Sequence, residues 1–124
     1  MKSSATLNGL AITAVAACHI LAGGMIDRVG EVTIRPYFSE MEGIELPLLT
    51  KWAASYIMSA WPVPVGFGLA ILSSIILAGV SLTESGRRFL PVLVAFSAAA
   101  ALLHLAGVWF ASTLPLMGGL EIGP

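Results

Sequence analysis

The chain has 124 residues, of which 57% are hydrophobic and only 10% are charged, with a formal net charge of −1 and a mean hydropathy of +0.93. Soluble domains carry about 25% charged residues, so the composition excludes an ordinary water-soluble domain and indicates side chains that face lipid. The charge balance gives no reason to expect a nucleic acid partner. The length allows a single domain over 1–124, and the lone Cys18 excludes an internal disulfide.

The first apolar run predicts a transmembrane helix over about residues 6–26. It contains no formally charged residue, and at 1.5 Å per residue it is long enough to cross a hydrocarbon core of about 30 Å. Within it, "VAAC" at 15–18 is similar to a lipoprotein cleavage box. Because the apolar run continues through "HILAGGMI", we interpret the segment as a retained membrane anchor.

The next segment, 27–51, is predicted to be an acidic loop on the outer side of the membrane. It carries five acidic residues against three basic ones. Within it, alternation of Val32 and Ile34 predicts a short extended piece, which Pro36 would confine to an edge. Two interpretations of this segment stay open: a solvated connector, or a surface that docks a partner on the outer side.

A short helix lying at the membrane interface is predicted over about 48–60, with Thr50 as its N-cap. We expect it to bend into the second span near Pro62, since proline suits a helix start or a kink. One long kinked helix is the alternative. Four aromatic side chains are predicted interface anchors: Trp52, Tyr56, Trp61 and Trp109.

Two further spans are predicted at about 63–82 and 89–112, which makes the fold an all-α membrane protein with three transmembrane helices. The turn between them, 83–88, contains Arg87 and Arg88, and the N-terminus carries Lys2. Three crossings place these basic segments on one side, so we expect the N-terminus in the cytoplasm and the tail from about 113 in the periplasm. The expected location is a bacterial inner membrane.

Small residues at fourfold spacing predict the faces on which the spans associate, because they let helix backbones approach closely. The predicted stripes are Gly66, Ala70, Ser74 and Ala78 in the second span, Gly9, Thr13 and Ala17 in the first, and, in the third, Ala95 with Ala99 and Ser97 with Ala101. These faces serve either packing among the three helices or docking to other membrane protein subunits, and the two uses are compatible.

His19 and His104 are the only histidines, and both fall in predicted spans. His19 lies eight residues before Asp27 and His104 eight before Ser112, which predicts that the two rings sit at the same depth. Three interpretations stay open: hydrogen bonding to a neighbouring helix, ligation of a haem or bacteriochlorophyll, and a proton relay. The absence of Asp and Glu from the predicted spans weakens the last.

Residues 96–106, "FSAAAALLHLA", resemble the pigment-binding helix of light-harvesting β polypeptides. In that family an alanine four residues before a histidine lets the macrocycle lie close to the helix, and an aromatic residue follows. Here Ala100 has that offset from His104, and Trp109 follows. The resemblance implies bacteriochlorophyll as a cofactor of His104. It covers the site alone, because those polypeptides are shorter, cross once and end in a basic, proline and aromatic cluster that this chain lacks.

Residues 36–61 resemble a segment of the inner-membrane F component of type II secretion and of small bacterial membrane proteins. There an aromatic stretch leads to a glycine, then Leu-Pro-x-x-Thr, then a helix that enters the membrane. Gly43, Leu46, Pro47 and Thr50 match this pattern. The soluble helical domains of that family are absent, so the resemblance implies an F-like component and not a full secretion role.

The sequence contains no Ser-His-Asp set, His-Glu-x-x-His motif, paired cysteines or glycine-rich phosphate loop. We therefore expect no enzyme. The leading hypothesis is a small accessory subunit of a larger membrane complex, with an energy-transducing or photosynthetic one favoured by His104. The alternatives are a haem- or bacteriochlorophyll-binding protein and an F-like secretion component.

Overall fold

The computed structural model describes residues 2–40, 43 and 45–118, and within them the chain is helical with no strand. Among these residues, three helical stretches are long and apolar enough to cross a membrane, which is the number that the sequence predicts. The elements in chain order are α1 (Lys2–Val29), the π-helix η1 (Gly30–Ile34), α2 (Arg35–Glu40), α3 (Leu48–Met58), α4 (Pro62–Ser81) and α5 (Glu84–Gly118).

The first span continues far beyond its predicted end. α1, η1 and α2 follow one another without a break, and the apolar helical stretch runs over Ser4–Glu40. The predicted loop 27–51 is therefore wrong over residues 27–40, and the predicted extended piece around Val32 is helical. The physical reason is a fourfold repeat: Ile34 and Phe38 are both buried in one cluster with Ile57, so residues read as an alternating strand form a helical face.

The π-helix ends two residues before a proline, Pro36. Pro36 lacks an amide hydrogen and its ring would collide with the carbonyl four residues earlier in a regular α-helix. In η1 the amide hydrogen bonds reach the carbonyl five residues earlier instead of four, as in the bond from the Arg35 amide to the Gly30 carbonyl. This wider turn lets the helix pass Pro36 without ending.

α3 is a separate helix, which excludes the alternative of one long kinked helix. It ends in a Schellman-type turn, in which the Trp61 amide donates to the Tyr56 carbonyl and the Ala60 amide donates to that of Ile57. Ala60 has a φ of 58°, the left-handed conformation that this turn requires. The change of direction from α3 to α4 is therefore made at Ala60, immediately before Pro62 begins α4.

Thr50 does not cap α3, which corrects the predicted role. Pro47 occupies the N-cap position and Thr50 lies inside the first turn. The Thr50 hydroxyl instead donates to the Ala111 carbonyl at 2.8 Å. Thr50 is fully buried, and its hydroxyl finds a carbonyl acceptor on α5.

The third span starts earlier and ends later than predicted. α5 begins at Glu84, so most of the predicted 83–88 turn is the first turn of the helix. The Thr83 hydroxyl accepts a hydrogen bond from the Gly86 amide at 3.0 Å, which is the bond an N-cap side chain makes. Glu84 adds a favourable negative charge at the positive end of the helix dipole.

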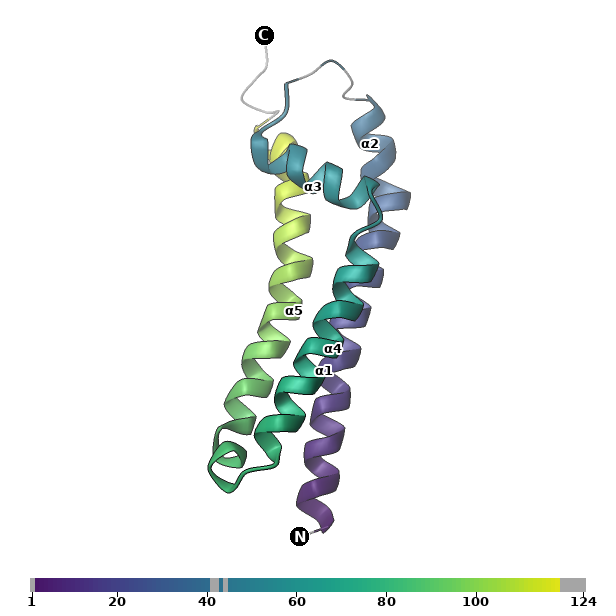
Figure 1. Cartoon of the computed structure of the whole chain (residues 1–124). Coiled ribbons are helices and arrows are strands. Elements are labelled where there is room, and N and C mark those ends of the chain that lie inside the picture. Colours follow the sequence, from purple (N-terminus) through teal and green to yellow (C-terminus); the bar gives the residue numbers. More distant parts are fainter. Residues whose placement is uncertain (1, 41–42, 44, 119–124) are drawn as a thin grey trace.

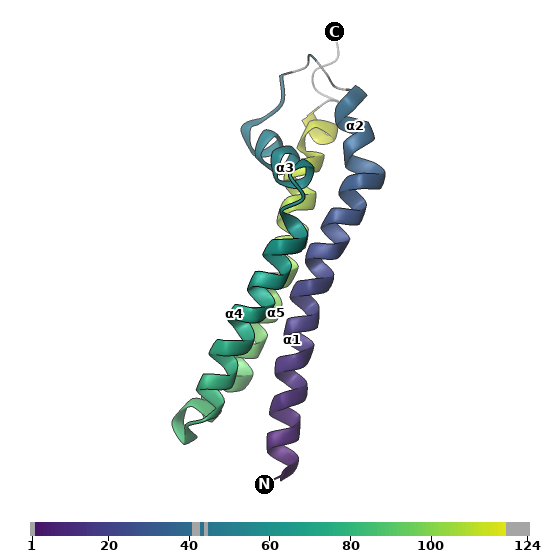
Figure 2. The same ribbon diagram turned by 45° about the vertical axis from the view of Figure 1, so that its right-hand side comes forward.

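α1 packs most extensively on α4, and α5 contacts both (Figure 1). The start of α1 and the α4–α5 turn lie at one end of the bundle, while α2, α3 and the last turns of α5 lie at the other (Figures 1 and 2). At the α1–α4 crossing, a Cβ added to Gly66 would lie 2.7 Å from the His19 carbonyl oxygen and 3.2 Å from Gly23 Cα. Glycine is therefore required for this approach.

The predicted small-residue stripes divide into inward and outward ones. In α4, Gly66 and Ala70 are buried, but Ser74 is half-buried and Ala78 exposed. In α1 the prediction is wrong as a description of packing within the chain, since the residues of its stripe are exposed: Gly9, Thr13 and Ala17. The contact between Gly23 and Gly66 fixes the rotation of α1 and turns a different face inward, which contains Val15 and His19.

Candidate functional site

His19 is the centre of a polar cluster where the three long helices meet. Its side chain is only 1% exposed. Nε2 lies 2.9 Å from Ser97 Oγ on α5 and 3.3 Å from Ser73 Oγ on α4, and the two serine oxygens are 2.9 Å apart. Each long helix thus contributes one polar side chain to a closed triangle, which satisfies polar groups that lipid cannot.

His104 has a different partner, supplied by a helix outside the three spans. Its Nε2 lies 2.5 Å from Tyr56 Oη on α3, and the two rings meet edge to face with centroids 5.7 Å apart. Burial raises the pKa of Tyr56 above its ordinary value. The phenol therefore stays uncharged at neutral pH, which suits a contact at the edge of an apolar bundle.

The two histidines lie at different levels, which overturns the predicted common depth. His19 bonds Ser97, and Ser97 precedes His104 by seven residues on α5. At 1.5 Å per residue the levels differ by about 10 Å. Counting back from Asp27 and Ser112 failed because α1 continues past Asp27 as helix, so Asp27 does not mark where the span ends.

Both histidines leave the same ring atom unpaired. Among the described residues, Nδ1 of His19 and Nδ1 of His104 are buried without a hydrogen-bond partner. An unpaired N–H is costlier in an apolar site than an unpaired lone pair. We therefore assign the proton of each neutral ring to Nε2, where a hydroxyl oxygen receives it.

α3 is held against its neighbours by two hydrogen bonds and by apolar packing. Thr50 and Tyr56 bond to Ala111 and His104 on α5. On the other side, Ile57 packs into the cluster formed with η1 and α2, so α3 bridges α5 and the upper part of the first span (Figure 1). Sequence reasoning assigned Tyr56 to the membrane interface and missed its partner. The sequence signal for this pairing was weak: Tyr56 carries a polar hydroxyl within a short, otherwise mostly apolar helix.

The fit of a haem or bacteriochlorophyll differs between the two rings. His19 does not fit, because its Nε2 is taken by two serines and three helices enclose the ring. His104 borders a shallow groove with Gly107 and Ala111, whose small side chains leave a flat surface. Its Nε2 is engaged by Tyr56, so ligation there requires Tyr56 to move. Binding of a macrocycle by His104 stays a prediction.

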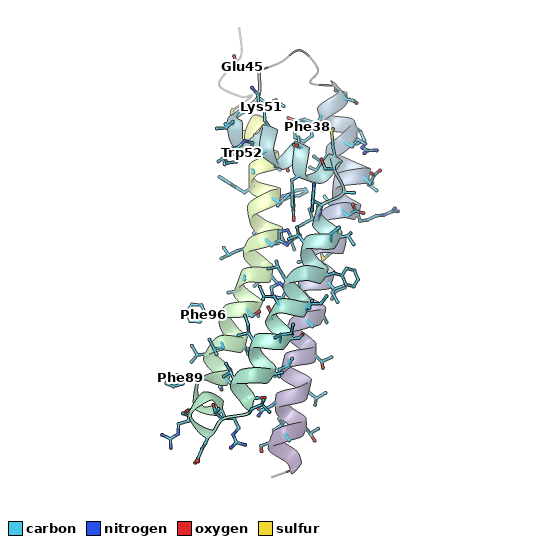
Figure 3. The ribbon with its side chains drawn as sticks, viewed as in Figure 1. Phe38, Glu45, Lys51, Trp52, Phe89 and Phe96 are labelled. Carbon is cyan, nitrogen blue, oxygen red and sulfur yellow. The ribbon has the colours of Figure 1, made fainter. Side chains whose placement is uncertain are left out.

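The four predicted anchors gather at the α3 end of the chain. Trp52 lies on α3 and projects from its outer side (Figure 3), Trp61 follows the end of α3, and both are largely exposed. Trp109 is 48% exposed on α5. Tyr56 is half-buried on His104. Phe89 and Phe96 project outward from the opposite half of α5 (Figure 3).

The described residues hold no group of three or more His, Cys, Asp or Glu side chains that could bind a metal ion. Cys18 is a free, exposed thiol on α1. No protein-family model, no curated protein and no solved structure matches this chain.

Proposed function

We propose that the chain is a small, non-catalytic accessory subunit of a larger complex in a bacterial inner membrane. The observation that carries the proposal is an outward-facing small-residue stripe on α5. Ala95 and Ala99 are exposed and lie in a shallow groove bordered by Pro91 and Phe96. In lipid, such a groove lets the backbone of another helix approach closely.

A comparison of the two α5 stripes supports this use. Ala101 is 3% exposed and Ser97 bonds to His19, so that stripe serves packing within the chain. The stripe of Ala95 and Ala99 has the same spacing and no described helix against it. In the most apolar window of α5 only 11% of residues are fully buried inside the chain, so a large part of this helix faces outward, toward lipid or a neighbour.

The orientation proposed is an N-terminus in the cytoplasm. Its support is the position of Arg87 and Arg88 near the start of α5, at the same end of the bundle as the start of α1 (Figure 1). Basic residues in short connections favour the cytoplasmic side. The end formed by α2 and α3 then faces the periplasm.

Copurification tests the proposal. The tagged full chain is extracted from native membranes in a mild detergent, and its partners are identified by mass spectrometry. We expect a membrane protein partner in fixed ratio. The double variant Ala95→Leu with Ala99→Leu fills the groove and should reduce its recovery about tenfold, equivalent to about 1.4 kcal/mol.

The matched control is Ala100→Leu, an exposed alanine on another side of the same helix. It should keep the partner. Absence of any partner from the wild-type chain, or equal recovery with both variants, contradicts the proposal.

The identity of the partner separates the two kinds of assembly. A subunit of an energy-transducing or photosynthetic complex agrees with the resemblance at 96–106, and a secretion component agrees with the one at 36–61. The groove beside His104 keeps a pigment- or haem-binding protein as the second candidate. A Soret or far-red absorbance band that His104→Leu abolishes would support it, and a colourless intact chain would reject it.

A further inference from the structure

An apolar cavity of about 380 Å³ lies between the first span and α5, next to α3. Its walls come from four elements. Ile26, Gly30 and Ile34 line it from α1 and η1, Ile57 from α3, and Leu105 and Trp109 from α5. It therefore lies in the half of the bundle that carries α3, away from the His19 cluster.

The cavity offers no polar partner to an occupant. Ser112 is the one hydroxyl in its lining, and that hydroxyl donates to the Val108 carbonyl at 2.7 Å. Ser112 is 1% exposed, so its bond is internal to α5. Water in a cavity needs two to four polar partners, and this lining supplies none. Hydrocarbon is the chemistry that fits.

The dimensions fit one extended chain. Along α5 the lining runs from Leu102 to Ser112, a rise of about 15 Å. This is half of a hydrocarbon core of about 30 Å, the depth that one leaflet occupies. Spread evenly over that length, a volume of about 380 Å³ gives an average width of roughly 5 Å, which admits a single hydrocarbon chain.

One side of the cavity is closed and another is open. At Gly30 a side chain would collide with Ile57, so glycine lets α3 pack against η1 and close that side. Met25, Leu102 and Trp109 in the lining are each about half exposed or more, so the cavity opens sideways toward lipid. A ligand can enter from the bilayer without passing through water.

We propose that this cavity binds one acyl chain of a membrane phospholipid from the leaflet on the α3 side. The bound acyl chain fills the space between α1, η1 and α5. There it makes dispersion contacts with the cavity walls. The headgroup lies at the α3 end, since the cavity extends from there toward the membrane centre.

The test measures lipid retained by the full chain. The protein is purified in a mild detergent with thorough washing, and its lipids are identified by mass spectrometry. We expect one phospholipid per chain. Ala106→Phe places a ring at the cavity wall and should lower retention about tenfold, because the ring takes the contacts of the acyl chain.

Ala100→Phe is the matched control, since Ala100 is exposed and does not line the cavity. It should retain lipid as the wild type does. Val108→Phe, which enters the same space from a half-buried position, repeats the test should Ala106→Phe fail to fold by circular dichroism.

A titration of the delipidated wild-type chain with dioleoyl phosphatidylcholine is independent of any variant. A rise in Tm that saturates at one lipid per chain supports the proposal. No retained phospholipid together with no rise in Tm overturns it. So does an isoprenoid or another non-acyl lipid held in place of phospholipid, or equal retention by the Ala106 and Ala100 variants.

Discussion

The two histidines of this chain stand in two regions built on different principles. His19 lies where α1, α4 and α5 meet, bonded to Ser73 and Ser97 from the other two spans. His104 lies where α5 meets the short helix α3, bonded to Tyr56. The first region is closed by contacts among spans. The second is closed by a helix that belongs to none of the three spans.

The difference shows how one residue type serves two purposes. In the His19 region, hydrogen bonds and the close contact of Gly23 with Gly66 hold the three spans together. A substitution there should therefore affect the whole bundle. In the His104 region, Tyr56 and Thr50 hold α3 against α5, so disturbance there releases one element. Variants in the two regions should therefore differ in kind as well as in size.

The largest effect is expected at the α1–α4 crossing. Gly66→Leu puts a side chain against the His19 carbonyl and Gly23 Cα, and backbone atoms cannot move aside as a flexible side chain would. The expected loss is about 3 kcal/mol of unfolding free energy, measured by unfolding in mixed micelles. Gly68→Leu is the control, because nothing lies within 4 Å of its Cβ position. An equal loss of stability in Gly66→Leu and Gly68→Leu would contradict the close contact of α1 and α4 at Gly66.

A smaller, still global effect is expected from the His19 cluster. Ser97→Ala removes one corner of the triangle and should cost about 1 kcal/mol, in the range of hydrogen bonds between membrane helices. In a His19→Leu background the same change should cost clearly less, since the shared bond is already gone. Ser74→Ala is the control because its hydroxyl bonds Ala70 of its own helix. An equal cost of Ser97→Ala in the wild type and in the His19→Leu background would contradict the hydrogen bond between His19 and Ser97.

The smallest effect is expected in the His104 region, and it should be local. Tyr56→Phe keeps the ring and removes the bond to His104, so α3 should detach more often while the spans hold. We expect amide hydrogen exchange in α3 to rise about twofold, from a loss of about 0.5 kcal/mol. Tyr37→Phe on α2, where the ring packs against Phe38, should leave α3 unchanged. A fall in the global stability of Tyr56→Phe would contradict this local role and show that Tyr56, like the His19 cluster, supports the whole bundle.

Much of the fold was predictable because lipid restricts the choices. Apolar length identified the three spans, and Pro62 marked the start of α4. Helix ends were less predictable. Acidic residues after 27 suggested a loop, but the buried repeat of Ile34 and Phe38 keeps the chain helical to Glu40. A polar exposed face and a buried apolar face coexist on one helix, and composition alone does not separate them.

The partners of the site residues were the least predictable part. Ser97 was expected on a packing face, and it bonds His19 from there. The sequence predicts Thr50 as a cap and Tyr56 as an interface anchor, and it does not predict that both side chains bond α5. These pairings join residues 48 to 78 positions apart in the chain, and no local pattern specifies them.

The sequence by itself determined that the chain folds as three apolar helices with a fourth, short one, because unsatisfied backbone groups are too costly in lipid for any other local structure. Only the tertiary structure decided which face of each helix turns inward. That choice depends on where Gly23 and Gly66 let two backbones touch, and it sets the partner of each histidine. It also leaves the stripe of Ala95 and Ala99 outside and a cavity beside α3.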